Sequence, residues 1–462
     1  PLPEDAYEYA DTLQAISDAE DNRILANRGR TTEVEAPVYA PTVTVPPCQK
    51  VVFPKAVIST LTNGLRVMTV ERSIVPVIEL VLSLPVKEYA DPQDKQGLYR
   101  FMCDVMLEGT KNYPGTLLAQ AIEGYGMSLN CEPGVISLTV LKEDFKKGLH
   151  FLNELLTQAL FEKEAIEKIR THLLMDLQVY WDEPQEFSNH LARAAVYKKH
   201  PYAKDPHGTF EGIESITSVD LKNWYKKACV SQGASLAVVG DTAGYDVLEE
   251  VQTVLGSWQG TDEEQLAVPQ LHPITAHTIS YPINRDQVVL LFAGLSIPRL
   301  HPDYEKLLLF DQIFGGGAQG SMSSRLFKVR EQTGLFYAIG GTLIAGCAEQ
   351  PGMVLVKTTV SLDRLKEAKT QLTDVMRSVV DSLTQEELVQ AKRTILEGLV
   401  ENVSSNKKVA GALLGLARFN LPASYFDTLP ERINAYTLSE VQVAARALLD
   451  TGKLITLEIG RV

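Results

Sequence analysis

A glycine-rich segment, FGGGAQGSMSSR, has residue types and spacing that could do chemistry, because loops of this kind can surround the phosphates of a nucleotide. Gly315 to Gly320 satisfies the spacing of both a GxGxxG dinucleotide loop and a P-loop. A dinucleotide loop must follow a strand, whereas this one follows the helical pattern DYEKLLLFDQIF. A P-loop needs Lys and then Ser or Thr after its last glycine, and Ser321 and Met322 stand there instead. We interpret the segment as a connection between helices that lines a cleft. The candidate cleft residues are Gly315, Gly316, Gly317 and Ser321.

Histidines and carboxylates give no recognisable metal motif. His150 with Glu154 and His301 with Glu305 are two His/Glu pairs with the i,i+4 spacing of a helix, and neither belongs to an HExxH or HxxEH motif. Two ligands are too few for a catalytic zinc, which needs three protein ligands and a base, so a solvated helix face explains these pairs better. The nucleophile motif GxSxG is also absent. We expect no metal in this chain.

Length and composition exclude several classes of protein. The 462 residues, 45% of them apolar and 22% charged, suit a globular chain of two or more domains. A net charge of −14 opposes binding to nucleic acid, and no stretch of about 18 uncharged apolar residues could span a membrane. Five scattered cysteines without a CxxC motif indicate buried thiols rather than disulfides. They are Cys48, Cys103, Cys131, Cys229 and Cys347.

The elements that must position any site begin after residue 50. Residues 1–50 combine an acidic stretch with the proline-rich APVYAPTVTVPP, and we interpret them as an extended arm. Two alternating runs around Asn63 and Gly64 then predict a β-hairpin. A strand over Val75–Leu84 and a helix over Gly97–Leu107 follow, and long helical patterns continue to about residue 200.

An internal repeat gives the domain organisation. The pattern that starts at Pro133, a Pro-Gly turn, a strand and an amphipathic helix, returns at Pro351. A Thr-capped helix and closing strand from Thr217 likewise return at Thr437, at almost the same offset. The sequence therefore predicts an α+β fold with two homologous halves, each a mixed sheet packed with helices. We assign the arm to 1–50, the first domain to 51–260, a linker to 261–277 and the second domain to 278–462.

Several segments resemble the pitrilysin/insulinase metallopeptidases, the M16 family. They are GLYRFMCDVMLEGT, LLAQAIEGYG, LLMDLQVYWDEPQEF and SMSSRLFKVREQTGLFYAIGG, and the similarity extends over nearly everything from Val51 to Val462. The resemblance implies two homologous halves that close as a clamp on a peptide. Active members carry HxxEH on a helix of the first half, where the histidines bind zinc, the glutamate activates water and a distant glutamate is the third ligand.

This sequence departs from that pattern at every zinc position. Alignment places Arg100 and Asp104 at the two histidines, Cys103 at the glutamate base and Asp176 at the third ligand. A guanidinium cannot ligate zinc, and a thiol is a poor substitute for a carboxylate base. We hypothesise that the guanidinium of Arg100 takes the place of the cation and pairs with Asp104 and Asp176.

The second half keeps the family's other functional residues. Arg330 and Tyr337 match an arginine and a tyrosine that, in active members, reach across to the substrate and the tetrahedral intermediate. The alternative is a purely structural role, in which Arg330 forms a salt bridge and Tyr337 is buried. The resemblance implies the zinc-less subunit of a heterodimeric peptidase, which binds peptide and supplies Arg330 and Tyr337 to a partner with HxxEH and zinc.

A different class of function stays open. Some inactive relatives, such as the core subunits of the respiratory cytochrome bc1 complex, serve mainly as scaffolds, and the proline-rich arm could anchor this chain in a larger assembly. An independently active zinc peptidase is disfavoured because it requires a metal site that the sequence does not contain. The start at Pro1 together with the arm favours a bacterial periplasmic or other extracytoplasmic location.

Overall fold

The computed structural model describes residues 12, 15–20, 22–23, 51–260, 268–317 and 320–461. Its contacts divide the chain into Pro1–Cys48 and Gln49–Val462. In the first unit the described residues are helical, and most of the predicted arm lies outside the described residues. Of the predicted linker, residues 268–277 contain no helix or strand, and residues 261–267 lie outside the described part.

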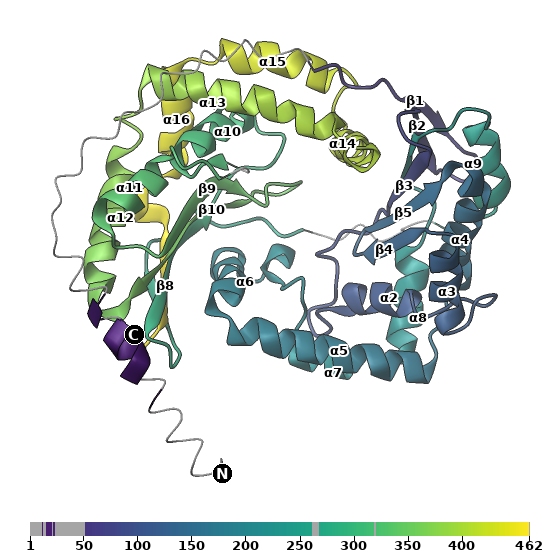
Figure 1. Cartoon of the computed structure of the whole chain (residues 1–462), viewed down its shortest axis with the longest axis horizontal. Helices are drawn as coiled ribbons and strands as arrows, with labels where there is room; N and C mark the ends of the chain where they lie inside the picture. Colours follow the sequence, from purple (N-terminus) through teal and green to yellow (C-terminus); the bar gives the residue numbers. More distant parts are fainter. Residues whose placement is uncertain are drawn as a thin grey trace. The chain divides into compact units, whose positions relative to one another are not determined.

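The first half of Gln49–Val462 contains a six-stranded sheet (Figure 1). Its strands are β1 (Val57–Thr60), β2 (Arg66–Glu71), β3 (Val77–Ser83), β4 (Ser128–Glu132), β5 (Val135–Leu141) and β6 (Ser235–Gly240). Its helices are α2 (Leu98–Met106), α3 (Thr116–Gly124), α4 (Phe145–Gln158), α5 (Lys163–Asp182), α6 (Pro184–Tyr197), α7 (Phe210–Ser215), α8 (Ser218–Ala228) and α9 (Val247–Leu255). The predicted hairpin is present as β1 and β2, and the side-chain amide of Asn63 in its turn donates to the carbonyls of Leu255 and Trp258.

The second half contains a five-stranded sheet. Its strands are β7 (Thr278–Pro282), β8 (Gln287–Leu295), β9 (Ala338–Ala345), β10 (Met353–Ser361) and β11 (Ile455–Gly460). Its helices are α10 (Tyr304–Phe314), α11 (Arg325–Thr333), α12 (Leu365–Ser378), α13 (Gln385–Gly398), α14 (Asn406–Arg418), α15 (Tyr425–Ala435) and α16 (Leu438–Leu448). None of the helices described in either half is long and apolar enough to cross a membrane.

The two sheets have the same topology, which confirms the predicted duplication. The strand order β2-β6-β3-β5-β4 corresponds to β7-β11-β8-β10-β9, and β1 is added to the first sheet. In these corresponding orders the pairs β2–β6 and β7–β11 are parallel, and all the other pairs are antiparallel. The predicted helix caps also match, because Thr217 and Thr437 each form a capping box with an acidic residue three positions later.

Each sheet is covered on one face by helices of its own half and on the other by a helix of the opposite half. Helix α14 of the second half packs on β6 and β3, and helix α6 of the first half packs on β8 and β11. Both exchanged helices are hydrogen-bonded to the opposite sheet near their first residues. Asn406 donates to the carbonyl of Val77 over 3.2 Å, and the amide of Gln185 donates to the hydroxyl of Thr359. The exchange joins the two halves into one compact unit.

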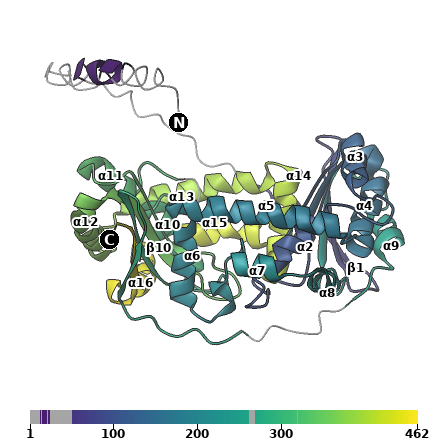
Figure 2. The same cartoon turned by 90° about the horizontal axis from the view of Figure 1, so that it is seen from below.

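Helix α5 carries the chain towards this exchange. Its 20 residues, about 30 Å of helix, contact α2 and α7 and then α6 (Figure 2). Four leucines and isoleucines at helical spacing bury one side of α5 in the first core. They are Ile166, Ile169, Leu173 and Leu177.

Truncation of Val409 to alanine tests how much the exchanged helix contributes. Val409 lies on α14, is fully buried and packs in the same cluster as Ala237 and Val239 of the first sheet. We expect Val409→Ala to lower the free energy of unfolding by about 2 kcal/mol, because a cavity forms between the halves. Urea unfolding measures the change. The matched control is Val443→Ala on α16, where the side chain is 62% exposed and the change should stay within about 0.5 kcal/mol. Equal effects of the two substitutions would show that α14 adds little to stability.

Candidate functional site

The helix with the degenerate zinc motif, α2, is fixed at its start by a buried carboxylate. Asp91 accepts hydrogen bonds from the backbone N–H groups of Gly97 and Tyr99 over 2.8 and 3.0 Å. These are donors that a helix cannot satisfy internally, and a negative charge is favourable at a helix N-terminus. Burial nevertheless raises the pKa of Asp91 to about 6. Asp91 thus holds the first turn of α2, from which Arg100 projects.

Arg100 forms ion pairs with the two carboxylates that the sequence predicts as its partners. Its Nη2 lies 2.7 Å from Oδ2 of Asp176 on α5, and its Nε lies 3.9 Å from Oδ2 of Asp104 one turn along α2. Burial raises the pKa of Asp104, the guanidinium of Arg100 opposes that rise, and the nearby Asp176 adds to it. The cation therefore compensates two carboxylates that would otherwise repel each other across α2 and α5.

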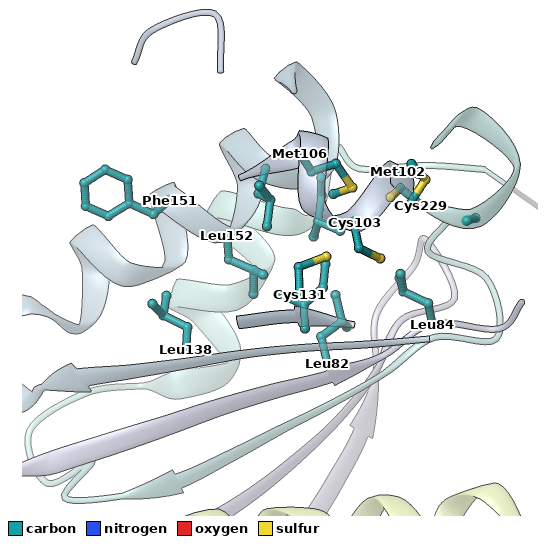
Figure 3. Packing of buried hydrophobic residues seen from close by; sticks show 14 of the residues in the cluster. Leu82, Leu84, Met102, Cys103, Met106, Cys131, Leu138, Phe151, Leu152 and Cys229 are labelled. Atoms are coloured by element: carbon teal, nitrogen blue, oxygen red, sulfur yellow. The ribbon is translucent and has the colours of Figure 1, made fainter. Parts of the chain in front are cut away.

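Cys103 points away from this ion pair into the first core. Its side chain is 1% exposed, and Figure 3 shows it packed near Cys131, Leu82 and Leu84. Burial raises the pKa of the Cys103 thiol well above its usual range, so the residue at the position of the family's base cannot take a proton from water near neutral pH. The four cysteines in the described residues are all free thiols, three of them buried, and Cys48 lies outside those residues.

These residues do not fit a zinc ion. Arg100 offers only donors, Cys103 faces the core, and the two aspartates are already bound to the guanidinium. Within 51–260, 268–317 and 320–461, no cluster of three or more His, Cys, Asp or Glu side chains could hold a metal ion. The two helical His/Glu pairs of the sequence do not change this conclusion, since Glu154 accepts from Asn112 and Glu305 binds Arg432.

The structure brings Arg330 and Tyr337 together on the surface of the second half. Nε of Arg330, on α11, donates to the carbonyl of Tyr337 over 3.1 Å, and its Nη1 lies 3.2 Å from Glu331. The ring of Tyr337, just before β9, is 76% exposed. Because the backbone N–H of Tyr337 donates to the carbonyl of Thr359 over 3.1 Å, the residue is anchored while its phenol stays free for contacts. The exposure of Tyr337 therefore contradicts the structural alternative, which expects a buried tyrosine at this position.

The two groups of predicted site residues lie on different halves. Arg100, Asp104 and Asp176 belong to α2 and α5, whereas Arg330 and Tyr337 belong to α11 and the residue before β9. Among the described residues, no hydrogen bond or ion pair joins the first group to the second. Within the described part of the chain, the Arg/Tyr pair is thus not in contact with the degenerate zinc positions.

The glycine-rich segment lies beside an apolar hollow of about 510 Å³. Gly317 lines this hollow, and Ser321 lines a smaller neighbouring one. Gly315 does not line either; it lies so close to the carbonyl of Gly341 on β9 that any side chain would clash. Gly316 has a φ of 95°, which suits glycine, and its carbonyl accepts from the N–H of Ser321. Two of the predicted cleft residues therefore line hollows and two shape the loop.

Asp311 is a buried carboxylate in this region that the sequence reasoning missed. It lies on α10 and lines the same hollow as Gly317. Its Oδ1 accepts from the N–H of Leu343 over 2.8 Å, its Oδ2 accepts from the hydroxyl of Thr342, and burial raises its pKa to about 7. The signal in the sequence that could have revealed Asp311 is a single acidic residue within the apolar run LLLFDQIF. Its contacts join α10 to β9, which gives it a positioning role.

Replacement of Arg100 tests the charge compensation. We expect Arg100→Met to destabilise the fold more at pH 8 than at pH 5. Without the guanidinium, the pKa of Asp104 in the folded state rises further above its unfolded value, and a carboxyl group of that kind costs stability as the pH rises through its folded pKa. Urea unfolding at both pH values measures the difference. Arg377→Met on α12 is the control, because Arg377 is exposed and its loss should have no pH-dependent effect. A loss of stability that is equal at both pH values would refute the compensation.

Asp311 gives a second pH dependence. Its folded pKa of about 7 lies above its ordinary value of 3.8, so the folded state holds a proton that the unfolded state has released over most of this range. Asp311 should therefore lower stability as the pH rises from about 4 to 7, and Asp311→Asn should remove this contribution while that of Asp91 remains. Unfolding midpoints at pH 5, 6, 7 and 8 test this, with the exposed Asp363→Asn as the control that retains it. Parallel curves for wild type and Asp311→Asn would contradict the assignment.

Comparison with known proteins gives consistent matches for both halves. Residues 75–209 match the domain described as Insulinase (Peptidase family M16), and residues 215–395 match Peptidase M16 inactive domain. An "Uncharacterized zinc protease" of Rickettsia bellii is 24% identical over 348 residues, which cover 74% of this chain and 82% of that protein. Cytochrome b-c1 complex subunit 1 of Bos taurus is 22% identical over 408 residues, 84% of this chain and 83% of that one.

A solved structure agrees in fold. The crystal structure of a peptidase M16 inactive domain from Pseudomonas fluorescens superposes with a TM-score of 0.80 at 23% sequence identity, covering 88% of this chain and 98% of that one. The matched domains span both halves, and the shared architecture is the duplicated α+β fold described above. Together with the Arg100 ion pairs at the zinc positions, these matches show that the chain belongs to peptidase family M16 and is a non-catalytic member of it.

Proposed function

We propose that this chain is the zinc-less subunit of a heteromeric M16-type peptidase, in which it binds peptide and supplies Arg330 and Tyr337 to an active site whose zinc is on an HxxEH-bearing partner. The observation that carries the proposal is that Tyr337 is exposed while its backbone carbonyl accepts a hydrogen bond from the guanidinium of Arg330. An exposed aromatic ring contributes little to a monomer, whereas phenol and guanidinium donors suit a peptide carbonyl or a developing oxyanion.

The chain's own residues would bind and orient the substrate. Strands β4 and β9 are the terminal strands of their sheets, and the backbone groups on their outer sides have no strand partner among the described residues. An extended peptide can pair with such an edge through backbone hydrogen bonds, which permits many sequences. Strand β4 contacts α2, and Tyr337 directly precedes β9, so both edges adjoin the candidate site residues.

The second candidate function is that of a scaffold within a larger assembly. It is favoured by the similarity to subunit 1 of the cytochrome b-c1 complex over 84% of this chain. A scaffold would not require an accessible Arg/Tyr pair, so substitutions at Arg330 and Tyr337 discriminate between the two functions.

The test is turnover by the complex isolated with its natural partner. We expect Tyr337→Phe to lower kcat for peptide hydrolysis by about 100-fold with the complex intact, because the loss of one donor to an oxyanion has effects of that order. Arg330→Met should have a comparable effect, and native mass spectrometry verifies assembly of each variant. Tyr281→Phe, at another partly exposed tyrosine on β7, is the matched control and should leave kcat unchanged. Full activity of both variants in an intact complex would support the scaffold instead.

A further inference from the structure

A second hollow, of about 360 Å³, lies at the outer edge of the first sheet, between the β1–β2 hairpin and helix α14. It is separate from the site residues described above and shares no lining residue with them. Its walls are mostly apolar and come from both halves of the chain. They include Phe53, Ile58 and Met68 on the sheet side and Leu413, Leu416 and Leu421 on the α14 side.

The hollow follows from the way α14 covers the sheet. Ile58 of β1 is paired with Met68 of β2 in the hairpin, and both side chains line the hollow. Helix α14 packs on β6 and β3, so towards the edge of the sheet its side chains face β1 and β2 across an open space. Met68 is buried there, whereas the side chain of Ile58 is 45% exposed. The space is therefore open at β1.

Strand β1 is also available for pairing. It is the terminal strand of its sheet and has no neighbour other than β2 among the described residues. A strand placed beside β1 would continue the sheet, and every second side chain of that strand would point to the same face as Ile58, into the hollow. Val57, which is 71% exposed, would face the other side. The free edge of β1 and the apolar hollow beside it therefore favour the binding of an extended peptide with apolar residues at alternate positions.

The charges around the hollow define the chemistry of that peptide further. Lys55 lies just before β1, and Arg66 is the partner of Thr60 at the other end of the strand. Neither cationic side chain forms a hydrogen bond or ion pair within the described residues of the chain. Asp427 is the one acidic side chain among the residues that line the hollow, so the two cations exceed it in charge. A carboxylate at either end of the peptide would meet a free cation.

A second copy of this chain is a poor occupant. Pairing of β1 with its own copy would bring together two edges that each have an excess of positive charge from Lys55 and Arg66, and these like charges repel. We propose that the edge of β1 binds an extended segment of another protein, with alternating apolar residues and a terminal or side-chain carboxylate. This site is independent of the proposed peptidase function, because it uses neither Arg330 nor Tyr337.

Fluorescence anisotropy on the full chain tests the proposal. The probe is a fluorescein-labelled eight-residue peptide of alternating valine and threonine that ends in a free aspartate. A second probe ends in an amidated asparagine, and a third carries proline at two central positions. We expect the first probe to bind and each of the others to bind at least about tenfold more weakly, since one lacks the carboxylate and the other lacks backbone donors.

Two variants of the chain locate the binding site. Arg66→Gln should lower the affinity for the first probe by about tenfold, because the lost interaction involves the carboxylate. The affinity for the amidated probe should not change. Ala423→Trp fills the exposed rim of the hollow without disturbing buried residues and should abolish binding. Ala119→Trp on α3 places the same ring at an exposed position away from the hollow and should have no effect.

Each contrary result would overturn the proposal. The absence of binding, or binding unaffected by Ala423→Trp, would refute the site. Equal affinity of the proline-containing probe would refute pairing with β1. Displacement of the probe by dodecanoate, combined with equal affinity of the proline probe, would identify a pocket for fatty acids instead of a peptide edge. Slower hydrogen exchange at the amides of Val57–Thr60 on binding would be the supporting result.

Discussion

Both sheets of this chain need a helix from the opposite half to bury their second face. The strands β3, β6 and β8 have apolar residues on both faces, so helices on one side alone would leave the other in water. Helix α14 of the second half covers the first sheet, and helix α6 of the first half covers the second sheet. The site elements depend on this arrangement, because α5 carries Asp176 and leads directly into α6.

Much of the fold could be predicted from the sequence because the duplication repeats its signals. Two Thr-capped helices and two Pro-Gly turns at nearly one offset give the element order, and Asn63 with Gly64 gives the hairpin. The exchange of α6 and α14 could not be predicted, since an amphipathic helix shows which of its faces is buried but not which sheet buries it. The added strand β1 has no counterpart in the second sheet, so the repeat held no information about it.

The sequence predicted the parts of the candidate site that belong to a family motif. It did not predict the side-chain directions and contacts that depend on how the helices pack. The positions of Arg100, Asp104 and Asp176 followed from alignment with a family pattern, and their ion pairs followed from elementary charge. The inward direction of Cys103, three residues from an ion-paired arginine on the same helix, depends on how α2 lies on its sheet. Asp311 was missed because an aspartate in an apolar helix has no sequence motif, and its partners are 31 and 32 residues away.

The exchange of helices also sets an order of events during synthesis. Strand β6 ends at Gly240, and α14 begins at Asn406, so a ribosome adding about 5 to 20 residues per second makes the cover on the order of ten seconds or more after the strand. During that interval the face that carries Ala237 and Val239 lacks its native neighbour. The nascent first half therefore exposes an apolar strand face to water until α14 has left the ribosome.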